Sequence, residues 1–193
     1  MIAAALLAAG ASRRLGTPKQ LLQVNGRSFV RHAAECARDA ELRVAVVVGH
    51  AASAVVDSLG GLEVETLENP RWSEGIASSV RVAVSWAESS KFEALLILVS
   101  DQPYLQATHL ERLCACYRER ECLVASAYAG TLGVPALFPA RYYACLASLQ
   151  GDRGAASLLR NASDVASVEW PLGVFDVDTK ALAAAFWPGV ATV

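Results

Sequence analysis

The sequence predicts an α/β fold in which a mostly parallel sheet carries helices on both faces. Short apolar runs of strand length alternate with helical patterns from one end of the 193 residues to the other, which is typical of βαβ units. Several of these runs are apolar throughout, as strands are when helices cover both of their faces. No Pro/Ser-rich linker or run of charge divides the chain, so we expect one domain over residues 1–193.

Strands are expected where small or β-branched apolar residues run together. Such runs lie at 2–8, 43–49, 62–67, 93–100, 122–127, 134–138 and 165–170. Helical patterns fill the stretches between them. In the first of these stretches one face collects Phe29, Val30, Ala33, Ala34 and Ala37, as an amphipathic helix requires. Helices are expected at 27–40, 51–59, 76–90, 106–120, 140–147, 154–161 and 179–187.

Charge and composition exclude several classes of protein. The formal net charge is −2, so we expect no broad basic face and no nucleic-acid partner, and any anion site must be local. No apolar stretch approaches the roughly 20 residues that cross a bilayer, so no membrane association is expected. The five scattered cysteines favour reduced thiols and a cytoplasmic location. The histidines, His32, His50 and His109, form no site by spacing and are expected to be structural or solvated.

Two predicted strand ends carry residues suited to a ligand, because ligands of such sheets bind outside the carboxyl ends of the strands. One is "SDQP" (100–103), and the other is the loop "GASRRLGTPK" (10–19). This loop fits neither the GxGxxG of dinucleotide-binding folds nor the GxxxxGK of P-loops. Gly10 and Gly16 nevertheless allow a close approach to an anion, and Arg14 and Lys19 supply charge. Spacing alone leaves open a phosphate loop or a tight turn with solvated cations.

The segment "LAAGASRRLGTPK" (7–19) resembles the LAAGxSxRMGxPK signature of the nucleotidyltransferases that attach CMP to the molybdenum cofactor, with Leu15 where methionine is usual. Further matches follow in the family's order: "ENPRWSEGIASSV" (68–80), "SDQP" (100–103), "YAGTLGVPALF" (128–138), "GDRGA" (151–155) and "DVDT" (176–179). The resemblance implies a Rossmann-like, three-layer fold of the nucleotide-diphospho-sugar transferase type. It also implies transfer of CMP from CTP to the terminal phosphate of molybdopterin, with release of pyrophosphate.

The resemblance assigns the phosphates and a metal to particular side chains. Arg14 and Lys19 are expected to hold the triphosphate and to stabilise the departing pyrophosphate, and together with Asp101 they are the expected catalytic residues. Mg²⁺ prefers oxygen ligands and keeps several waters, so one or two carboxylates suffice. Asp101 is the expected first ligand and Asp178 the second, in preference to Asp176. Without the resemblance, Asp101 is typical of a turn or a helix cap before Pro103, and Asp178 is typical of the cap of a helix that begins near Thr179.

The resemblance also places the nucleoside. The pair Ala8–Ala9 stands before Gly10 where guanylyl-transferring relatives tend to have a second glycine, which favours cytosine. Trp72 has two interpretations, a ring that packs on the ligand and the commoner one of buried scaffolding. The residues expected to bind the nucleotide are Leu7, Ala8, Ala9, Gly10, Ser12, Arg14, Lys19, Asn69, Gly75, Ser78 and Ser79.

The acceptor is expected to lie against Gly130, Gly133, Pro135 and Arg153. The family often continues as GDxGAR or GDxGAK, whereas this chain has Ala156. This departure leaves open a related transferase that uses another nucleotide or another phosphorylated acceptor. A non-catalytic nucleotide- or cofactor-binding maturation factor is the second alternative, because it would keep the phosphate loop without needing Asp101. The resemblance points to a molybdoenzyme or its maturation chaperone as the protein partner.

Overall fold

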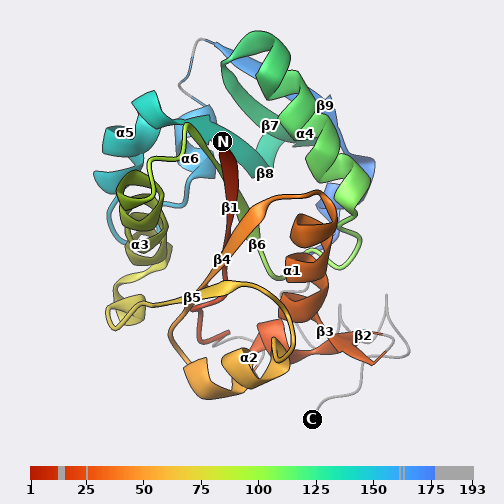
Figure 1. Cartoon of the computed structure of the whole chain (residues 1–193), viewed down its shortest axis with the longest axis vertical. Coiled ribbons are helices and arrows are strands. Elements are labelled where there is room, and N and C mark those ends of the chain that lie inside the picture. Colours follow the sequence, from red (N-terminus) through yellow and green to blue (C-terminus); the bar gives the residue numbers. More distant parts are fainter. Residues whose placement is uncertain (13–15, 25, 161, 163, 177–193) are drawn as a thin grey trace.

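A seven-stranded sheet forms the centre of the fold (Figure 1). The computed structural model describes the whole chain except residues 13–15, 25, 161, 163 and 177–193. The strands lie in the order β5-β4-β1-β6-β8-β7-β9. They are β1 (Ile2–Leu7), β4 (Arg43–Val48), β5 (Glu65–Glu68), β6 (Ala94–Val99), β7 (Leu123–Tyr128), β8 (Thr131–Pro139) and β9 (Val165–Glu169). A separate two-stranded ribbon contains β2 (Gln23–Val24) and β3 (Arg27–Ser28).

The prediction of a mostly parallel sheet is confirmed. β1 pairs in parallel with β4 and with β6, β4 pairs in parallel with β5, and β7 pairs in parallel with β9. In the described part of this sheet only β8 runs against its neighbours, β6 and β7. Every residue of β1 is buried, because this strand lies inside the sheet with helices over both of its faces.

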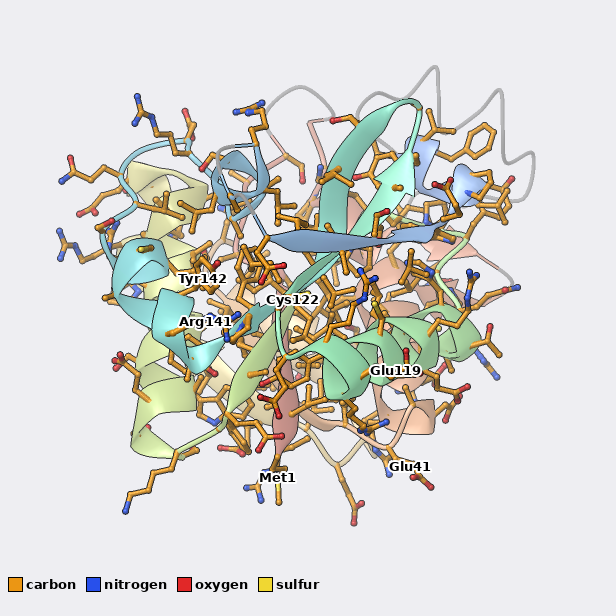
Figure 2. The ribbon with its side chains drawn as sticks, turned by 90° about the horizontal axis from the view of Figure 1, so that it is seen from above. Met1, Glu41, Glu119, Cys122, Arg141 and Tyr142 are labelled. Atoms are coloured by element: carbon orange, nitrogen blue, oxygen red, sulfur yellow. The ribbon has the colours of Figure 1, made fainter. Side chains whose placement is uncertain are left out.

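The helices form a layer on each side of the sheet, which gives the expected three layers. Alternate residues of β1 point to opposite faces: Ala4 and Leu6 pack in one core with α1 (Phe29–Asp39), α2 (Ala52–Ser58) and α4 (Ala107–Arg120). Ala3 and Ala5 pack in the other core with α3 (Ile76–Ser89), α5 (Tyr143–Ala147) and α6 (Ala156–Leu159). Seen from above, Glu119 of α4 and Tyr142 beside α5 lie in these separate layers (Figure 2).

Several element boundaries differ from those expected. Ser28 pairs with Gln23 and accepts a hydrogen bond from the Arg31 N–H, so the helix expected at 27–40 begins one residue after this cap. The strand expected at 62–67 begins only at Glu65, and the helix expected at 140–147 divides into a 3-10 turn, η3 (Ala140–Tyr142), and α5. The helix expected at 154–161 is reduced to the four residues of α6. The helix expected at 179–187 lies outside the described residues.

The strand expected at 134–138 is longer than predicted, because β8 continues a hairpin with β7. Ala129 and Gly130 have positive φ angles of 49° and 72° and turn the chain back. The register shifts between Ala125 and Ser126, which opens the hairpin locally. This hairpin lies next to β6 and therefore beside the end of that strand.

The topology brings the carboxyl ends of β1, β4 and β6 together at one edge of the sheet. The Ala8 N–H donates to the Val47 carbonyl, so the chain after β1 continues alongside β4 before it turns away. The Asn69 N–H donates to the Val48 carbonyl and fixes the segment after β5 at the same edge. This is the edge at which such sheets bind their ligands. Within the described residues no helix has the length and apolar character needed to cross a membrane.

Candidate active site

A cavity of about 450 Å³ opens at this edge, between the loop after β1, the end of β6 and the start of α3. Of the residues expected to bind nucleotide or metal, those that line it are Leu7, Ala8, Ala9, Gly10, Lys19, Gly75, Ser79 and Asp101. These residues lie up to 94 positions apart in the sequence. The cavity wall also includes Trp72, Glu74, Ile76 and Asp152.

Lys19 and Asp101 form an ion pair at this cavity, with Lys19 Nζ donating to Asp101 Oδ2. Lys19 begins a short 3-10 helix, η1 (Lys19–Leu21), and its N–H donates to Ser12 Oγ at 2.9 Å. Asp101 follows β6, so its carboxylate stands at the end of a buried strand. The side chains are 26% and 14% exposed, which limits the screening of this pair by solvent. Ser12 therefore orients Lys19 rather than lining the cavity.

Gln20 holds the loop in place and was not foreseen from the sequence. Its side chain is 2% exposed, and Nε2 donates to the carbonyls of Ala8 and Gly10, at 3.2 and 3.1 Å. These bonds satisfy backbone groups of the loop that no strand pairs. A glutamine directly after the lysine of a basic loop carries no local signal for this role.

The Asp101 carboxylate is suited to a divalent cation. Oδ1 is buried and, within the described part of the chain, has no hydrogen-bond partner, while Oδ2 is bound by Lys19. A buried carboxylate oxygen without a donor is costly unless a ligand satisfies it. No group of three or more His, Cys, Asp or Glu side chains suited to a metal occurs among the described residues.

The other expected phosphate and metal residues are placed as follows. Arg14 and Asp178 lie outside the described residues. Asp176 is exposed, and its charge, like that of Asp101, contributes to raising the pKa of the Tyr128 hydroxyl, for which burial is the larger cause. Both carboxylates therefore lie close enough to Tyr128 for their charges to act on its hydroxyl.

The start of α3 forms the wall opposite the loop. Gly75 has φ 104° and ψ 176°, a conformation open almost only to glycine. The loop after α5 packs directly onto it, and the Gly151 carbonyl accepts a hydrogen bond from the Ala77 N–H at 3.1 Å. The same loop carries Asp152 into the cavity wall. Glycine is required at position 75 because a side chain there would meet this loop.

Asn69 and Ser78 lie behind this wall instead of lining the cavity. Asn69 is 1% exposed, and its Nδ2 donates to the hydroxyls of Ser78 and Ser79, at 2.8 and 3.0 Å. The Ser78 hydroxyl in turn donates to the Gly75 carbonyl at 2.8 Å. Of the three polar residues, only Ser79 reaches the cavity, and the other two hold it and Gly75 in place.

Two arginines donate hydrogen bonds to the Glu74 carboxylate. Arg71 Nε donates to Glu74 Oε1 at 2.6 Å, and Arg81 Nη2 donates to Oε2 at 2.9 Å. The hydrogen bond from Arg71, with a smaller contribution from Arg81, lowers the pKa of Glu74. Arg81 Nη1 also donates to the Leu149 carbonyl at 2.7 Å, so this cluster fastens the loop of Asp152 to the start of α3.

Trp72 lies between the scaffold and the cavity. It is half-buried, packs on the His50 ring with centroids 5.1 Å apart, and also lines the cavity. Gly49 lies beneath it, where a Cβ atom would be 2.7 Å from Trp72 Cβ. One part of Trp72 is thus scaffold, and another part is accessible to a ligand.

The expected acceptor residues lie apart from this cavity. Gly130, Gly133 and Pro135 belong to the β7–β8 hairpin and are not among the residues that line it. Arg153 is exposed, and its neighbour Asp152 faces the cavity instead. The hairpin is joined to the site through Gln102, which follows Asp101 and donates to the Val134 carbonyl.

The histidines lie on separate elements. His32 of α1 is within 3.0 Å of the Leu105 carbonyl, and His50 packs on Trp72. His109 of α4 is buried, bonds to Ser126 at 2.8 Å, and stacks on Trp170. Burial, with a smaller effect of Arg112, lowers the pKa of His109 to about 4, so this residue is neutral at pH 7.

Comparison with known proteins identifies the family. The model of the MobA-like NTP transferase domain matches residues 4–166. The chain belongs to this family. Purine catabolism protein PucB of Bacillus subtilis is 30% identical to it over 163 residues, which cover 80% of this chain and 78% of PucB.

Solved structures agree with this family. Rv0371c from Mycobacterium tuberculosis is 29% identical, with a TM-score of 0.83 over 96% of each chain. A structure of Rv0371C in complex with manganese is 27% identical, with a TM-score of 0.77 over 98% of this chain and 99% of that one. Molybdopterin-guanine dinucleotide biosynthesis protein A from Archaeoglobus fulgidus has the same fold at 17% identity, with a TM-score of 0.72 over 97% of each chain. The predicted fold type, that of the nucleotide-diphospho-sugar transferases, is confirmed.

Proposed function

We propose that this nucleotidyltransferase transfers CMP from CTP to the terminal phosphate of molybdopterin, with Mg²⁺ bound and with release of pyrophosphate. One observation carries the proposal. Asp101 holds a buried carboxylate oxygen that lacks a donor among the described residues, and it lies beside Lys19 in the cavity at the carboxyl ends of β1 and β6. A cation and an available carboxylate at the end of a parallel strand suit a metal-bound triphosphate.

The distribution of charge on the cavity wall orients the nucleotide. Lys19 stands on the loop side with Asp101, whereas Glu74 of η2 (Trp72–Glu74) and Asp152 of the loop after α5 stand beside the start of α3. Lys19 and the backbone of the glycine loop attract a triphosphate, and a divalent cation held by Asp101 would attract it further, whereas Asp152 repels it. The phosphates therefore lie toward Lys19 and Asp101, and the base lies toward Trp72, Glu74 and Asp152.

The same wall supports a base that carries an amino group. Asp152 is exposed at the cavity, and an ionised carboxylate only accepts hydrogen bonds. The exocyclic amino group of cytosine donates such a bond, whereas uracil presents a carbonyl oxygen at the same position. Adenine and guanine also carry amino groups, so the choice of cytosine over them rests on the Ala8–Ala9–Gly10 pattern of the family.

The reaction needs little covalent chemistry from the protein. An oxygen of the acceptor phosphate bonds to the α-phosphorus of CTP while the bond from that phosphorus to the pyrophosphate oxygen breaks. The nucleophile is already an anion at pH 7, so a general base is not required. Lys19 neutralises charge on the departing pyrophosphate, and the loop backbone holds the triphosphate in line. Asp101 would hold Mg²⁺, which supplies further charge neutralisation when bound.

Several features agree with this assignment without testing it. Rv0371C, 27% identical to this chain, was solved in complex with manganese, which is a divalent cation like Mg²⁺. The cysteines are free thiols, which suits a cytoplasmic location. The product would pass to a molybdoenzyme or to its maturation chaperone.

One observation favours a second candidate, a related transferase with a different acceptor. Ala156 begins α6 and packs toward the core, so this position supplies no cation for an acceptor phosphate. A phosphorylated acceptor that is smaller or less charged than molybdopterin would need fewer cations. A panel of phosphorylated acceptors with labelled CTP separates the two candidates.

Thermal unfolding with CTP, GTP, ATP and UTP, each with Mg²⁺, tests the nucleotide. A ligand that binds only the native state raises the midpoint, by the equivalent of about 2.7 kcal/mol at a hundredfold excess over Kd. We expect CTP to give the largest rise and UTP the smallest of the four. A larger rise with GTP would contradict the assignment of CTP, and no rise with any nucleotide would contradict nucleotide transfer.

A further inference from the structure

The Val134 carbonyl joins the β7–β8 hairpin to the loop that carries Asp101. It accepts a hydrogen bond from Gln102 Nε2 at 2.9 Å and another from the Tyr128 hydroxyl at 3.2 Å. Gln102 immediately follows Asp101, and Tyr128 ends β7. Two donors from different segments thus meet on one acceptor.

Gln102 is placed where its side chain can fix its neighbour. It is 6% exposed, and its Oε1 atom is buried with no donor among the described residues. Its side chain also interacts with the Tyr128 hydroxyl, which offsets part of the rise that burial causes in the pKa of that hydroxyl. The backbone that holds Gln102 is the same backbone that directs the Asp101 carboxylate toward the cavity.

Tyr128 is held in one orientation by its surroundings. Its ring meets Trp170 edge-on, with centroids 6.1 Å apart, and Gly133 and Gly173 lie so close to it that a Cβ atom on either would collide with the ring or hydroxyl. Gly173 belongs to η4 (Pro171–Val174), the last described turn before Asp176. Tyr128 therefore contacts the hairpin, the Asp101 loop and the C-terminal segment at once.

A second bond secures the next carbonyl of the hairpin. The Ser126 hydroxyl, fully buried, donates to the Pro135 carbonyl at 2.6 Å, and His109 Nε2 lies 2.8 Å from the same hydroxyl. Because the Ser126 hydroxyl donates its one proton to the Pro135 carbonyl, it can only accept a hydrogen bond from His109. His109 must therefore donate through Nε2. The Val134–Pro135 segment is thus held by polar contacts on both of its carbonyls.

We propose that Gln102 and Tyr128 are positioning residues that set the Asp101 carboxylate for a divalent cation, by fastening its loop to the Val134 carbonyl of the β7–β8 hairpin. The inference rests on the proposed function, in which Asp101 holds the metal. Neither residue lines the nucleotide cavity. Their loss should therefore weaken metal binding and leave metal-free nucleotide binding unchanged.

The test measures Mn²⁺ binding directly. Free Mn²⁺ is followed by its electron paramagnetic resonance signal while it is titrated into the protein, in separate arms with CTP, GTP, ATP or UTP. Tyr128→Phe keeps the ring and removes one donor, and Gln102→Met keeps the approximate shape and removes the other. Tyr142→Phe is the control, because Tyr142 lies in η3 and makes neither of the two bonds to the Val134 carbonyl.

We expect each variant to bind Mn²⁺ about tenfold more weakly than wild type, in keeping with the effect of residues that orient metal ligands. The double variant should lose less than the product of the two losses, since both donors serve one carbonyl. Nucleotide affinity without metal, and Mn²⁺ affinity of Tyr142→Phe, should stay within twofold of wild type.

Two results would overturn the inference. Mn²⁺ affinities of Tyr128→Phe and Gln102→Met equal to that of Tyr142→Phe would show that the contact does not position Asp101. Equal losses of Mn²⁺ affinity and of metal-free nucleotide affinity would show a general structural role. A wild-type protein that binds Mn²⁺ with none of the four nucleotides would instead contradict the proposed function, and the positioning role with it.

Discussion

Substitution of Gly75 by alanine tests whether the loop that carries Asp152 packs on the start of α3. Gly75 is at the start of α3 and has φ 104° and ψ 176°. A Cβ atom at this position would lie 2.6 Å from Asp152 Oδ1, and the Gly151 carbonyl would be closer still. The Gly151 carbonyl is part of the backbone and also accepts the Ala77 N–H, so it cannot yield without loss of that bond.

The expected cost has two parts. Holding alanine in this region of φ and ψ costs about 2 kcal/mol, and loss of the hydrogen bond to Gly151 costs about 1 kcal/mol. A total of about 3 kcal/mol lowers the Tm of a domain of this size by about 10 °C. Displacement of Gly151 also moves Asp152, so we expect Gly75→Ala to bind CTP at least tenfold more weakly than wild type.

Gly61→Ala is the matched control, measured by calorimetry and by CTP titration. Gly61 also has a positive φ, of 80°, but nothing lies within 4 Å of the Cβ atom that alanine would add. Its expected cost is the backbone strain alone, about 1 kcal/mol or about 3 °C, with CTP affinity unchanged. A Gly75→Ala protein that melts and binds CTP as Gly61→Ala does would refute the packing of the loop on α3.

Two further predictions concern a cation and a buried ring. Lys19→Met should slow pyrophosphate release by a factor of about 10²–10³, because a preorganised charge is lost. Lys91→Met, which removes a lysine at an exposed position, should leave the rate unchanged. Equal losses of rate in both variants would contradict a specific role for Lys19. Folding lowers the pKa of His109 from about 6.5 in the unfolded chain to about 4. Between about pH 6.5 and pH 4 the unfolded state therefore binds a proton that the folded state does not, so the free energy of unfolding declines as the pH falls. Full loss is about 3 kcal/mol, complete below about pH 4, and urea unfolding of wild type and His109→Gln between pH 7 and pH 4 should show a steeper decline in wild type, because carboxylates such as Glu74 titrate in both proteins.

The parallel half of the sheet could be predicted because burial on both faces leaves a direct mark on the sequence. The runs that became β1, β4 and β6 are apolar at nearly every position. The β7–β8 hairpin left a weaker mark. Its residues 131–133 lack alternation, and the contact of Tyr128 with Gly133 inside the hairpin leaves no local pattern.

The candidate site also has a part that could be predicted from the sequence and a part that could not. Lys19 and Asp101 could be predicted because strand ends and a family signature mark them, and the structure brings them into one ion pair. Asp152 reaches the same cavity through the packing of a distant loop on α3. For Asn69 the sequence pattern indicated the right neighbourhood, but the side chain is buried behind the wall, since it bonds to Ser78 and Ser79.

Transfer of label from CTP tests the central claim most directly. The protein is incubated with CTP labelled at the α-phosphate, molybdopterin cofactor and Mg²⁺, and both the labelled cofactor and pyrophosphate are measured. We predict one pyrophosphate for each CMP transferred, no reaction without the cofactor, and loss of turnover in Asp101→Ala. Pyrophosphate release at the same rate with and without the cofactor would contradict this account. Label transfer by Asp101→Ala at the wild-type rate would contradict it as well.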